Sequence, residues 1–486
     1  MLIKFKLMLS LLVCLCLVSD EVESAIRDNP RAKVPKPRSH TDHSTFFSQP
    51  FPDGSSVTRA CLECHKSAAS DLMKTAHWNW VGDEAVLAPG HDQPVHIGKK
   101  NLMNNYCIGI QSNWVRCTQC HAGYGWEDDT FDFSKQDNVD CLVCHDWTTT
   151  YNKDPNGAGR PDPKVDLLAV ARSVGYPKRA NCGYCHFAGG GGDAVKHGDM
   201  DGSLLNPRER IDIHMSRHKL ECIDCHQTKN HLIPGRLISV SIDAKNRFDC
   251  TLCHAPRPHK DMRLNAHGSA VACQTCHIPR IAPEEATKMV WDWSQAGDKE
   301  REKRIGDPHQ YTAIKGEFQY AVNIAPEYAW FNGTADHYLL GETIDPEGVT
   351  AMARPLGSIH DATARIWPFK VHRGKQIYDL KNRYFIIPKT YGPGGYWTEF
   401  DWDKAARLGS QATGLDYSGS FGFASTEMFW PINHMVVTSR QALACKDCHG
   451  QGGRLNWESL GYDGDPAVRG GRLRTGILIP ESEGGR

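Results

Sequence analysis

The sequence predicts a fold of short α-helices and irregular loops wrapped around a core that side chains alone do not fill, with little β structure. Three observations favour this class. The motif Cys-x-x-Cys-His occurs eight times, which leaves about 60 residues of chain for each copy. The 486 residues include 44 glycines and 27 prolines, which interrupt regular elements. The hydrophobic content of 40% is typical of a globular chain and not of a disordered one.

Cys-x-x-Cys-His is the attachment sequence of a c-type haem. Two thiols bond to the vinyl groups of one porphyrin, and the adjacent histidine binds the iron. Zinc sites and disulfides are the alternatives, but neither requires a histidine after the second cysteine of every copy. The sequence therefore predicts a multihaem cytochrome c with eight c-type haems. The cysteines expected to bond haem are Cys61, Cys64, Cys117, Cys120, Cys141, Cys144, Cys182, Cys185, Cys222, Cys225, Cys250, Cys253, Cys273, Cys276, Cys445 and Cys448. The expected proximal iron ligands are His65, His121, His145, His186, His226, His254, His277 and His449.

The N-terminus has the pattern of a secretory signal peptide. Lys4 and Lys6 precede an apolar run from Leu7 to Val18, which is shorter than the roughly 20 residues of a membrane span. We expect residues 1–25 to be removed by cleavage near residue 24–25, and the mature chain to be periplasmic without a transmembrane segment. An uncleaved anchor is the alternative. A formal net charge of −1 gives no basic surface for nucleic acid.

The motifs are unevenly spaced along the chain. We expect residues 26–290 to form a haem-binding region with seven motifs, and residues 431–486 to hold the eighth haem. Residues 291–430 are haem-free and aromatic-rich, and we expect them to cover the core. Packing is the favoured role of this region, and a wall over one haem, with His372, Lys375 and Gln376, is the alternative. Short helices are expected to carry each motif and many of the distal ligands.

Sixteen histidines lie outside the motifs. Haems that carry electrons usually have a second axial ligand, which we expect to be histidine in most cases. A hydrogen-bonding or surface role is the alternative for each candidate. The distal candidates are His43, His77, His197, His214, His231, His259, His267 and His434.

One cysteine and one lysine stand apart from this pattern. Cys107 is the only cysteine outside both the motifs and the signal segment, and it precedes Cys117 by ten residues. It is either a small buried hydrophobe or a reactive thiol near that haem. Lys196 lies in "GGGGDAVKHGDMD", residues 189–201, three residues after Asp193. From these residues alone, Lys196 is a solvated lysine on a glycine loop.

Several longer segments resemble the octahaem tetrathionate reductase family of octahaem cytochromes, over most of the mature chain. They are "DHSTFF", "VTRACLECHKSAA", "TAHWNW", "NNYCIGI", "CTQCHAGYGW", "CLVCHDWTTTY", "GGGGDAVKHGDMDGSL", "CIDCHQTKNH", "LNAHGSAVACQTCHIPR", "PFKVHRGKQIYD" and "FWPINHMV". The resemblance implies a catalytic haem bound by a lysine amine in place of a distal histidine, with an aspartate and an unpaired cysteine nearby. These residues match Lys196, Asp193 and Cys107. The catalytic haem is then the one on Cys117 and Cys120, and Lys153 remains a rival to Lys196.

The resemblance implies a reductase. Tetrathionate is reduced to thiosulfate, with nitrite and hydroxylamine as close alternative substrates, and the other seven haems relay electrons. The electrons are expected to come from a donor cytochrome or a quinol-linked donor. A pure electron-transfer protein with eight saturated haems is a second hypothesis. Hydroxylamine oxidation is a third, and no cross-linking tyrosine is identifiable to support it.

Overall fold

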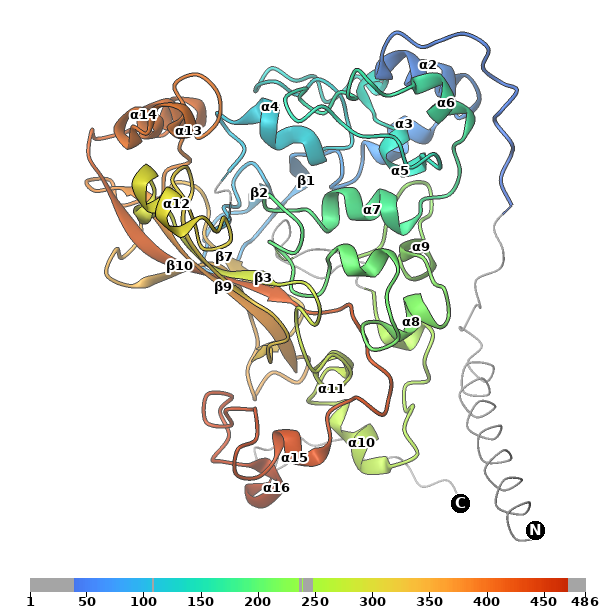
Figure 1. Cartoon of the computed structure of the whole chain (residues 1–486). Coiled ribbons are helices and arrows are strands. Elements are labelled where there is room, and N and C mark those ends of the chain that lie inside the picture. Colours follow the sequence, from blue (N-terminus) through green and yellow to red (C-terminus); the bar gives the residue numbers. More distant parts are fainter. Residues whose placement is uncertain (1–38, 107–108, 236–237, 239–247, 471–486) are drawn as a thin grey trace, which may run out of the picture.

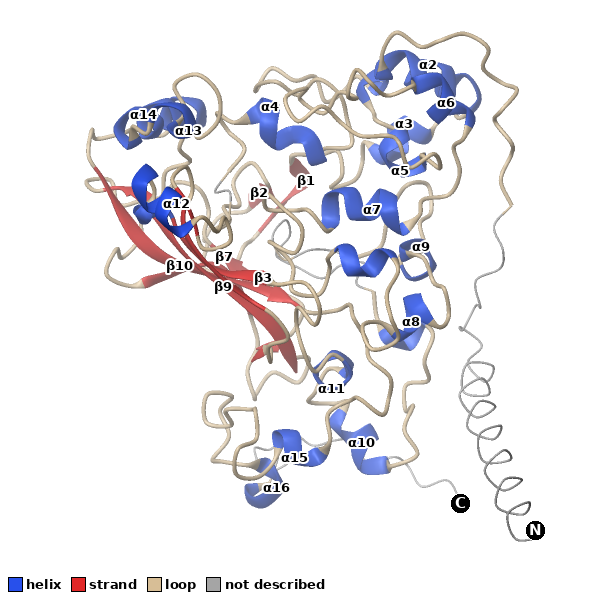
Figure 2. Ribbon diagram, in the orientation of Figure 1, coloured by secondary structure: helices blue, strands red, loops and turns tan. Residues whose placement is uncertain are grey.

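The computed structural model describes residues 39–106, 109–235, 238 and 248–470. Most of the helices lie on one side of the molecule, and the strands of the large sheet gather on the other side together with α12, α13 and α14 (Figures 1 and 2). The expected signal peptide, residues 1–25, lies outside the described residues. None of the described helices has the length and apolar character needed to cross a membrane.

As expected, each of the eight motifs lies in or at the end of a short helix. Two residues three apart on a helix lie on the same face, so both thiols of a motif are directed to one cofactor. The elements that carry motifs are α2 (Gly54–Cys64), α4 (Trp114–Cys117) with the 3-10 helix η1 (Thr118–Cys120), α5 (Leu142–His145), α7 (Arg179–His186), α9 (Cys222–Cys225), η4 (Cys250–Leu252), α11 (Cys273–His277) and α15 (Cys445–Cys448).

The remaining helices are also short, and aspartate side chains begin several of them. Asp166, Asp212 and Asp401, for example, each accept a hydrogen bond from a backbone amide of the first turn, a cap that contributes about 1 kcal/mol. These helices are α3 (Ala68–Leu72), α6 (Leu167–Arg172), α8 (Ile213–Ser216), α10 (Met262–His267), α12 (Lys299–Ile305), α13 (Tyr396–Glu399), α14 (Trp402–Thr413), α16 (Pro466–Arg469), η2 (Gln136–Asn138), η3 (Gly202–Leu205) and η5 (Trp293–Gln295).

The expectation of little β structure is wrong. The region between the seventh and eighth motifs forms an eight-stranded sheet of order β4-β5-β3-β9-β10-β8-β7, with β6 paired to β9. A separate two-stranded sheet precedes the second motif. The strands are β1 (Val81–Val86), β2 (Val95–Gly98), β3 (Thr287–Asp292), β4 (Tyr311–Thr312), β5 (Gly316–Ala321), β6 (Glu327–Phe331), β7 (Ala335–His337), β8 (Val349–Pro355), β9 (Arg365–Asp379) and β10 (Phe421–Pro431).

The central strand β9 explains why the sequence did not indicate a sheet. It is buried along nearly its whole length, so its sequence lacks the polar–apolar alternation that marks a half-buried strand. Burial of Ile366, Phe369 and Val371 contributes about 1.5–3 kcal/mol for each side chain. Lys370 and His372 are buried in the same strand and interrupt its apolar pattern.

The main apolar cluster joins the sheet to the segment before the second motif and to the loop after the fourth motif. Met428 and Trp430 of β10 pack in it together with Tyr106 and Val195. In the antiparallel register of β9 and β10, Trp430 is opposite Lys370 and Met428 is opposite His372. The sheet therefore forms a rigid wall behind the segment that carries Lys196.

Candidate functional site

One continuous cavity of about 4440 Å³ runs along the helical side of the molecule. Cysteines and histidines of six motifs, from the second to the seventh, line it. Pockets for single small molecules usually measure about 300–1,000 Å³. The cavity therefore has the size and the lining of a channel for several cofactors, each bonded to its own motif.

Seven motif histidines each face a second histidine. Metal–nitrogen bonds of about 2 Å on both sides of one iron place two imidazole centroids about 6 Å apart. The observed centroid separations are 6.3 Å for His65 and His43, 6.1 Å for His186 and His77, 6.3 Å for His145 and His231, 6.0 Å for His254 and His214, 6.3 Å for His226 and His434, 6.0 Å for His277 and His259, and 6.2 Å for His449 and His267. The residues thus fit haem at seven motifs.

Hydrogen bonds orient several of these rings. The Nδ1 atom of His145 donates to Gly175 O at 2.8 Å, and that of His226 donates to Pro234 O at 2.8 Å. A proton on Nδ1 leaves Nε2 as the nitrogen that can bind iron. Burial lowers the pKa of His186 to about 3, which keeps that ring neutral. Further Nδ1 bonds run from His43 to Thr41 O at 2.7 Å, His267 to Arg263 O at 2.8 Å, His434 to Asp199 Oδ2 at 3.1 Å and His449 to Asp465 Oδ1 at 2.6 Å.

Helices supply fewer of the facing histidines than expected. His214 lies in α8 and His267 ends α10, whereas the other five lie in loops and turns. A loop can bring a side chain to a cofactor from any direction, which a helix of one or two turns cannot.

The second motif is the exception to the histidine pairs. Among the ring contacts of the described residues, His121 meets only tryptophan and phenylalanine, with centroid distances of 4.9 Å to Trp78 and 4.8 Å to Trp126. Its Nε2 lies 2.9 Å from Trp78 O, and its Nδ1 is buried without a hydrogen bond. The residues at this motif therefore provide one histidine and not two.

Cysteines of different motifs lie next to one another. Cys61 contacts Cys141, Cys120 contacts Cys185, Cys182 contacts Cys222, and Cys250 contacts Cys273 through side-chain hydrogen bonds. The second motif thus lies next to the fourth, and the fourth next to the fifth; the first motif lies next to the third, and the sixth next to the seventh. Cofactors bonded to these thiols lie next to one another, as electron transfer between them requires.

The backbone around Lys196 is held firmly from the sheet. Lys370 Nζ donates to Val195 O at 2.8 Å and to Lys196 O at 3.1 Å. Thr287 Oγ1 in β3 donates to Ala194 O at 2.5 Å, and the Tyr106 hydroxyl donates to Lys196 O at 2.8 Å. The glycine run therefore leads into a fixed segment and not into a freely moving one.

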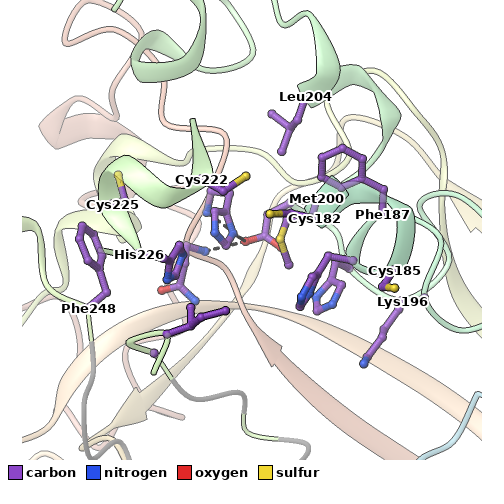
Figure 3. Close-up of a pocket in the computed structure, with 18 of the residues that line it drawn as sticks. Cys182, Cys185, Phe187, Lys196, Met200, Leu204, Cys222, Cys225, His226 and Phe248 are labelled. Carbon is purple, nitrogen blue, oxygen red and sulfur yellow. Dashed lines mark hydrogen bonds and ion pairs between the residues drawn. The ribbon is translucent and has the colours of Figure 1, made fainter. Parts of the chain in front are cut away.

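The Lys196 side chain extends beside the fourth motif into the cavity (Figure 3). Its Nζ lies 4.9 Å from the ring centroid of Trp430. A Cβ on Gly189 would come within 3.1 Å of Lys196 Cδ and 3.3 Å of Cys185 O, so glycine allows the close packing seen here. Lys196 lines the cavity together with Cys120, and the positive charges of Lys99, Lys153 and Lys196 all act on the Cys120 sulfur. Lys196 is therefore near the second motif.

The other two residues expected at the catalytic haem have different positions. Asp193 is exposed, and its carboxylate accepts hydrogen bonds from Gly202 N at 2.9 and 3.1 Å, which closes the loop between them. Cys107 lies outside the described residues. The preceding Tyr106 is buried and stacks on His372 at 4.0 Å, so the start of the Cys107 segment reaches the backbone of Lys196.

Two candidate iron ligands from the sequence, His197 and Lys153, have other contacts. The ring of His197 contacts Trp430 at 5.2 Å, and no motif histidine is among its ring contacts in the described part of the chain. Lys153, the rival of Lys196, is buried with its Nζ at 2.6 Å from His121 O and 3.0 Å from Asp140 Oδ2. Its amine is thus bound to the chain behind the second motif.

Sequence reasoning missed two kinds of residue. Lys370, Thr287 and Tyr106 hold the Lys196 segment, and only the isolated charge of Lys370 in an apolar strand hinted at such a role. Lys99 lines the cavity, and its charge helps to lower the pKa of His121, for which burial is the main cause. A lysine pair between two turns, as in "IGKKN", gives no sequence signal for this position.

The fold and the histidine pairs define a multihaem c-type cytochrome. A family model described as "Cytochrome c bacterial" matches residues 288–452. The structure is similar to that of octaheme cytochrome c from Shewanella oneidensis, with 50% sequence identity, a TM-score of 0.82, and coverage of 88% of this chain and 98% of that one. No curated protein matches the chain. The chain belongs to the octahaem cytochromes c.

Membership of the octahaem cytochromes c identifies the cofactors and the broad class of activity. The protein carries eight c-type haems, and the zinc and disulfide alternatives for the motifs are excluded. Its function is electron transfer and oxidoreduction.

Proposed function

We propose that the protein is an exported octahaem reductase in which seven haems relay electrons to one catalytic haem at the second motif. The observation that carries this proposal is the exception among the motif histidines. Seven of them face a second histidine at 6.0–6.3 Å, whereas His121 has no such partner among the described residues, and Lys196 lines the same cavity and acts through its charge on Cys120 of that motif. A fully paired iron carries electrons, and a replaceable ligand admits a substrate.

The chain's residues have distinct roles in this proposal. The seven histidines that face motif histidines are the distal ligands, and His197 is the surplus candidate. Lys196 would hold the catalytic haem iron through its neutral amine, which a substrate could replace. His121 is the proximal ligand, and its bond to Trp78 O has to give way for Nε2 to bind iron. Asp193 fixes the loop that positions Lys196.

The substrate that fits this site best is the tetrathionate dianion. A bound haem supplies an iron that passes on electrons and binds small ligands. Two electrons break the central S–S bond of tetrathionate and give two thiosulfate anions, with no proton consumed. The ammonium groups of Lys196 and Lys99 and the guanidinium of Arg116, all at the cavity, favour the anionic substrate and the departing anions. We assign Cys107 the role of a thiol that contacts the substrate, as the family resemblance implies.

Nitrite and hydroxylamine are alternative substrates at the same iron. Both are small and bind through nitrogen, but both need protons as well as electrons, which Lys196 would have to relay. Electrons arrive from a periplasmic donor cytochrome or a quinol-linked donor, and residues 1–25 direct export. A pure electron-transfer role is the second candidate, because the chain has enough histidines for eight pairs.

The spectrum of the oxidised protein separates these functions. Cyanide or nitrite should change the signal of about one-eighth of the haem if one iron has an exchangeable ligand. An unchanged spectrum would support eight saturated haems and electron transfer alone. Steady-state rates of reduction with tetrathionate, nitrite and hydroxylamine, measured with one reduced dye as donor, then rank the substrates. Hydroxylamine-dependent reduction of an oxidised dye would instead favour hydroxylamine oxidation as the activity.

A further inference from the structure

Lys153 and Asp140 form an ion pair directly behind the second motif. Lys153 Nζ lies 3.0 Å from Asp140 Oδ2, and both side chains are 0% exposed. The same amine donates to His121 O at 2.6 Å and lies 3.5 Å from Gly123 O. Transfer of two charges to the protein interior is costly, and such a pair persists only when other groups satisfy it. Here the backbone beside the expected proximal ligand satisfies the lysine.

The carboxylate of Asp140 has its own set of donors. The hydroxyls of Tyr124 and Tyr151 donate to it at 2.8 and 2.9 Å. The amide of Val143 donates to Oδ1 at 3.1 Å, and Val143 lies between the two thiols of the third motif in α5. The ion pair therefore links the chain at His121 to the helix that carries the third haem.

We propose that Lys153 and Asp140 are positioning residues that hold these two motifs together and set the reduction potentials of the second and third haems. A charge buried in protein acts strongly on its surroundings because little water screens it. A cation near an iron favours the reduced state, and an anion favours the oxidised state. In the intact pair these two effects largely cancel, and the geometry of the His121 backbone is fixed at the same time.

Opposite changes of charge provide the test. Lys153→Met leaves the carboxylate uncompensated and should lower the potentials of the second and third haems. Asp140→Asn leaves the ammonium uncompensated and should raise them. The double variant should return both potentials close to the wild-type values. Potentiometric titration followed by optical and paramagnetic resonance spectra measures these shifts, and mass spectrometry checks that each variant carries eight haems.

Two further variants keep the test decisive. Lys288→Met removes another buried lysine, whose amine lies over Trp291 and Phe318 at 3.6 and 3.7 Å, and should leave both potentials unchanged. Tyr151→Phe removes one donor to the Asp140 carboxylate, and should give a smaller shift in the direction of Lys153→Met. If the charge variants do not take up eight haems, the potentials of Tyr151→Phe show whether the Asp140 carboxylate influences the second and third haems.

Shifts of the same sign in Lys153→Met and Asp140→Asn, or equal shifts at all eight haems, would overturn the proposal. So would an unchanged potential in Tyr151→Phe when the charge variants do not load. These potentials do not depend on which substrate is reduced. A wild-type protein without reductase activity would therefore refute the proposed function and leave this inference standing.

Discussion

The ring of His197 packs edge-on against Trp430, with 5.2 Å between the ring centroids. The amine of the preceding residue, Lys196, lies 4.9 Å from the same tryptophan ring. Two neighbouring side chains thus meet one tryptophan of β10, and the histidine is the one packed into the core. Both residues line the cavity, but the lysine is the less buried of the two, and its charge acts on Cys120 of the second motif.

Replacement of Lys196 by leucine should affect one haem only. The variant loses the proposed exchangeable ligand and a positive charge beside the departing anions, so turnover should fall by about 10²–10³-fold. The paramagnetic resonance spectrum should change in about one-eighth of its low-spin intensity, because the other seven irons keep both histidines.

His197→Gln is the matched control for this experiment. It removes an imidazole next to Lys196 but no proposed ligand, so all eight resonance signals should persist. If Lys196→Leu gives the wild-type spectrum, Lys196 is not an iron ligand. If His197→Gln abolishes a low-spin signal, His197 is a ligand.

The histidine pairs predict a separable effect at the fourth haem. His77→Ala removes the ring that faces His186 at 6.1 Å, so one low-spin haem should become high-spin or bind an added ligand. Cys120 of the second motif lies next to Cys185 of the fourth motif, so the fourth haem is expected to pass electrons to the second. Electron transfer to the second haem should therefore also slow. Stopped-flow reduction monitors that step. His96→Ala, at an exposed position in β2, should leave both the spectrum and the rate unchanged.

The sequence alone was sufficient for the cofactors because covalent attachment needs fixed chemistry at fixed spacing. Eight copies of Cys-x-x-Cys-His specify eight haems whatever the tertiary fold of the chain. The facing histidines carry no such spacing. His434 faces His226 from more than 200 residues away in the chain, so only the folded structure shows which histidine meets which.

The sheet and the Lys196 segment illustrate what sequence patterns miss. Strand β9 is buried on both faces and mixes lysine, histidine and glutamine with apolar residues, so neither alternation nor a continuous apolar run marks it. From its neighbours in the sequence, Lys196 was expected to be a solvated lysine on a glycine loop. Three donors from Lys370, Thr287 and Tyr106 instead fix its backbone, and each comes from a distant part of the chain.

A serine at position 107 tests the role of the unpaired thiol. Cys107→Ser keeps the size of the side chain and should leave the haem count at eight. Turnover with tetrathionate should fall, because a serine hydroxyl does not have the reactivity of a thiol toward a sulfur-containing substrate. Mass spectrometry and the steady-state rate give the two readouts. Wild-type turnover in the variant would mean that Cys107 is only a small buried side chain.

The loop that positions Lys196 should loosen as the pH rises from about 4 to about 6. Burial, together with the charges of Asp193 and Glu285, raises the pKa of Asp201 to about 6 from a usual value of 3.8. In this window the folded loop holds a proton that the opened loop has lost, so protection falls as pH rises. The loss approaches about 3 kcal/mol above pH 6.

Hydrogen exchange at the amides of Gly202 and Ser203 measures this change, once the rates are corrected for the intrinsic effect of pH. Asp201→Asn keeps the oxygen that accepts from Ser203 N at 2.9 Å and removes the charge, so it should abolish the dependence and protect the loop better above pH 6. Asp193→Asn should shift the window to lower pH, since it removes one of the charges that oppose ionisation of Asp201. Exchange that is independent of pH in the wild type, or equally dependent in Asp201→Asn, would assign the loop's stability to groups other than Asp201.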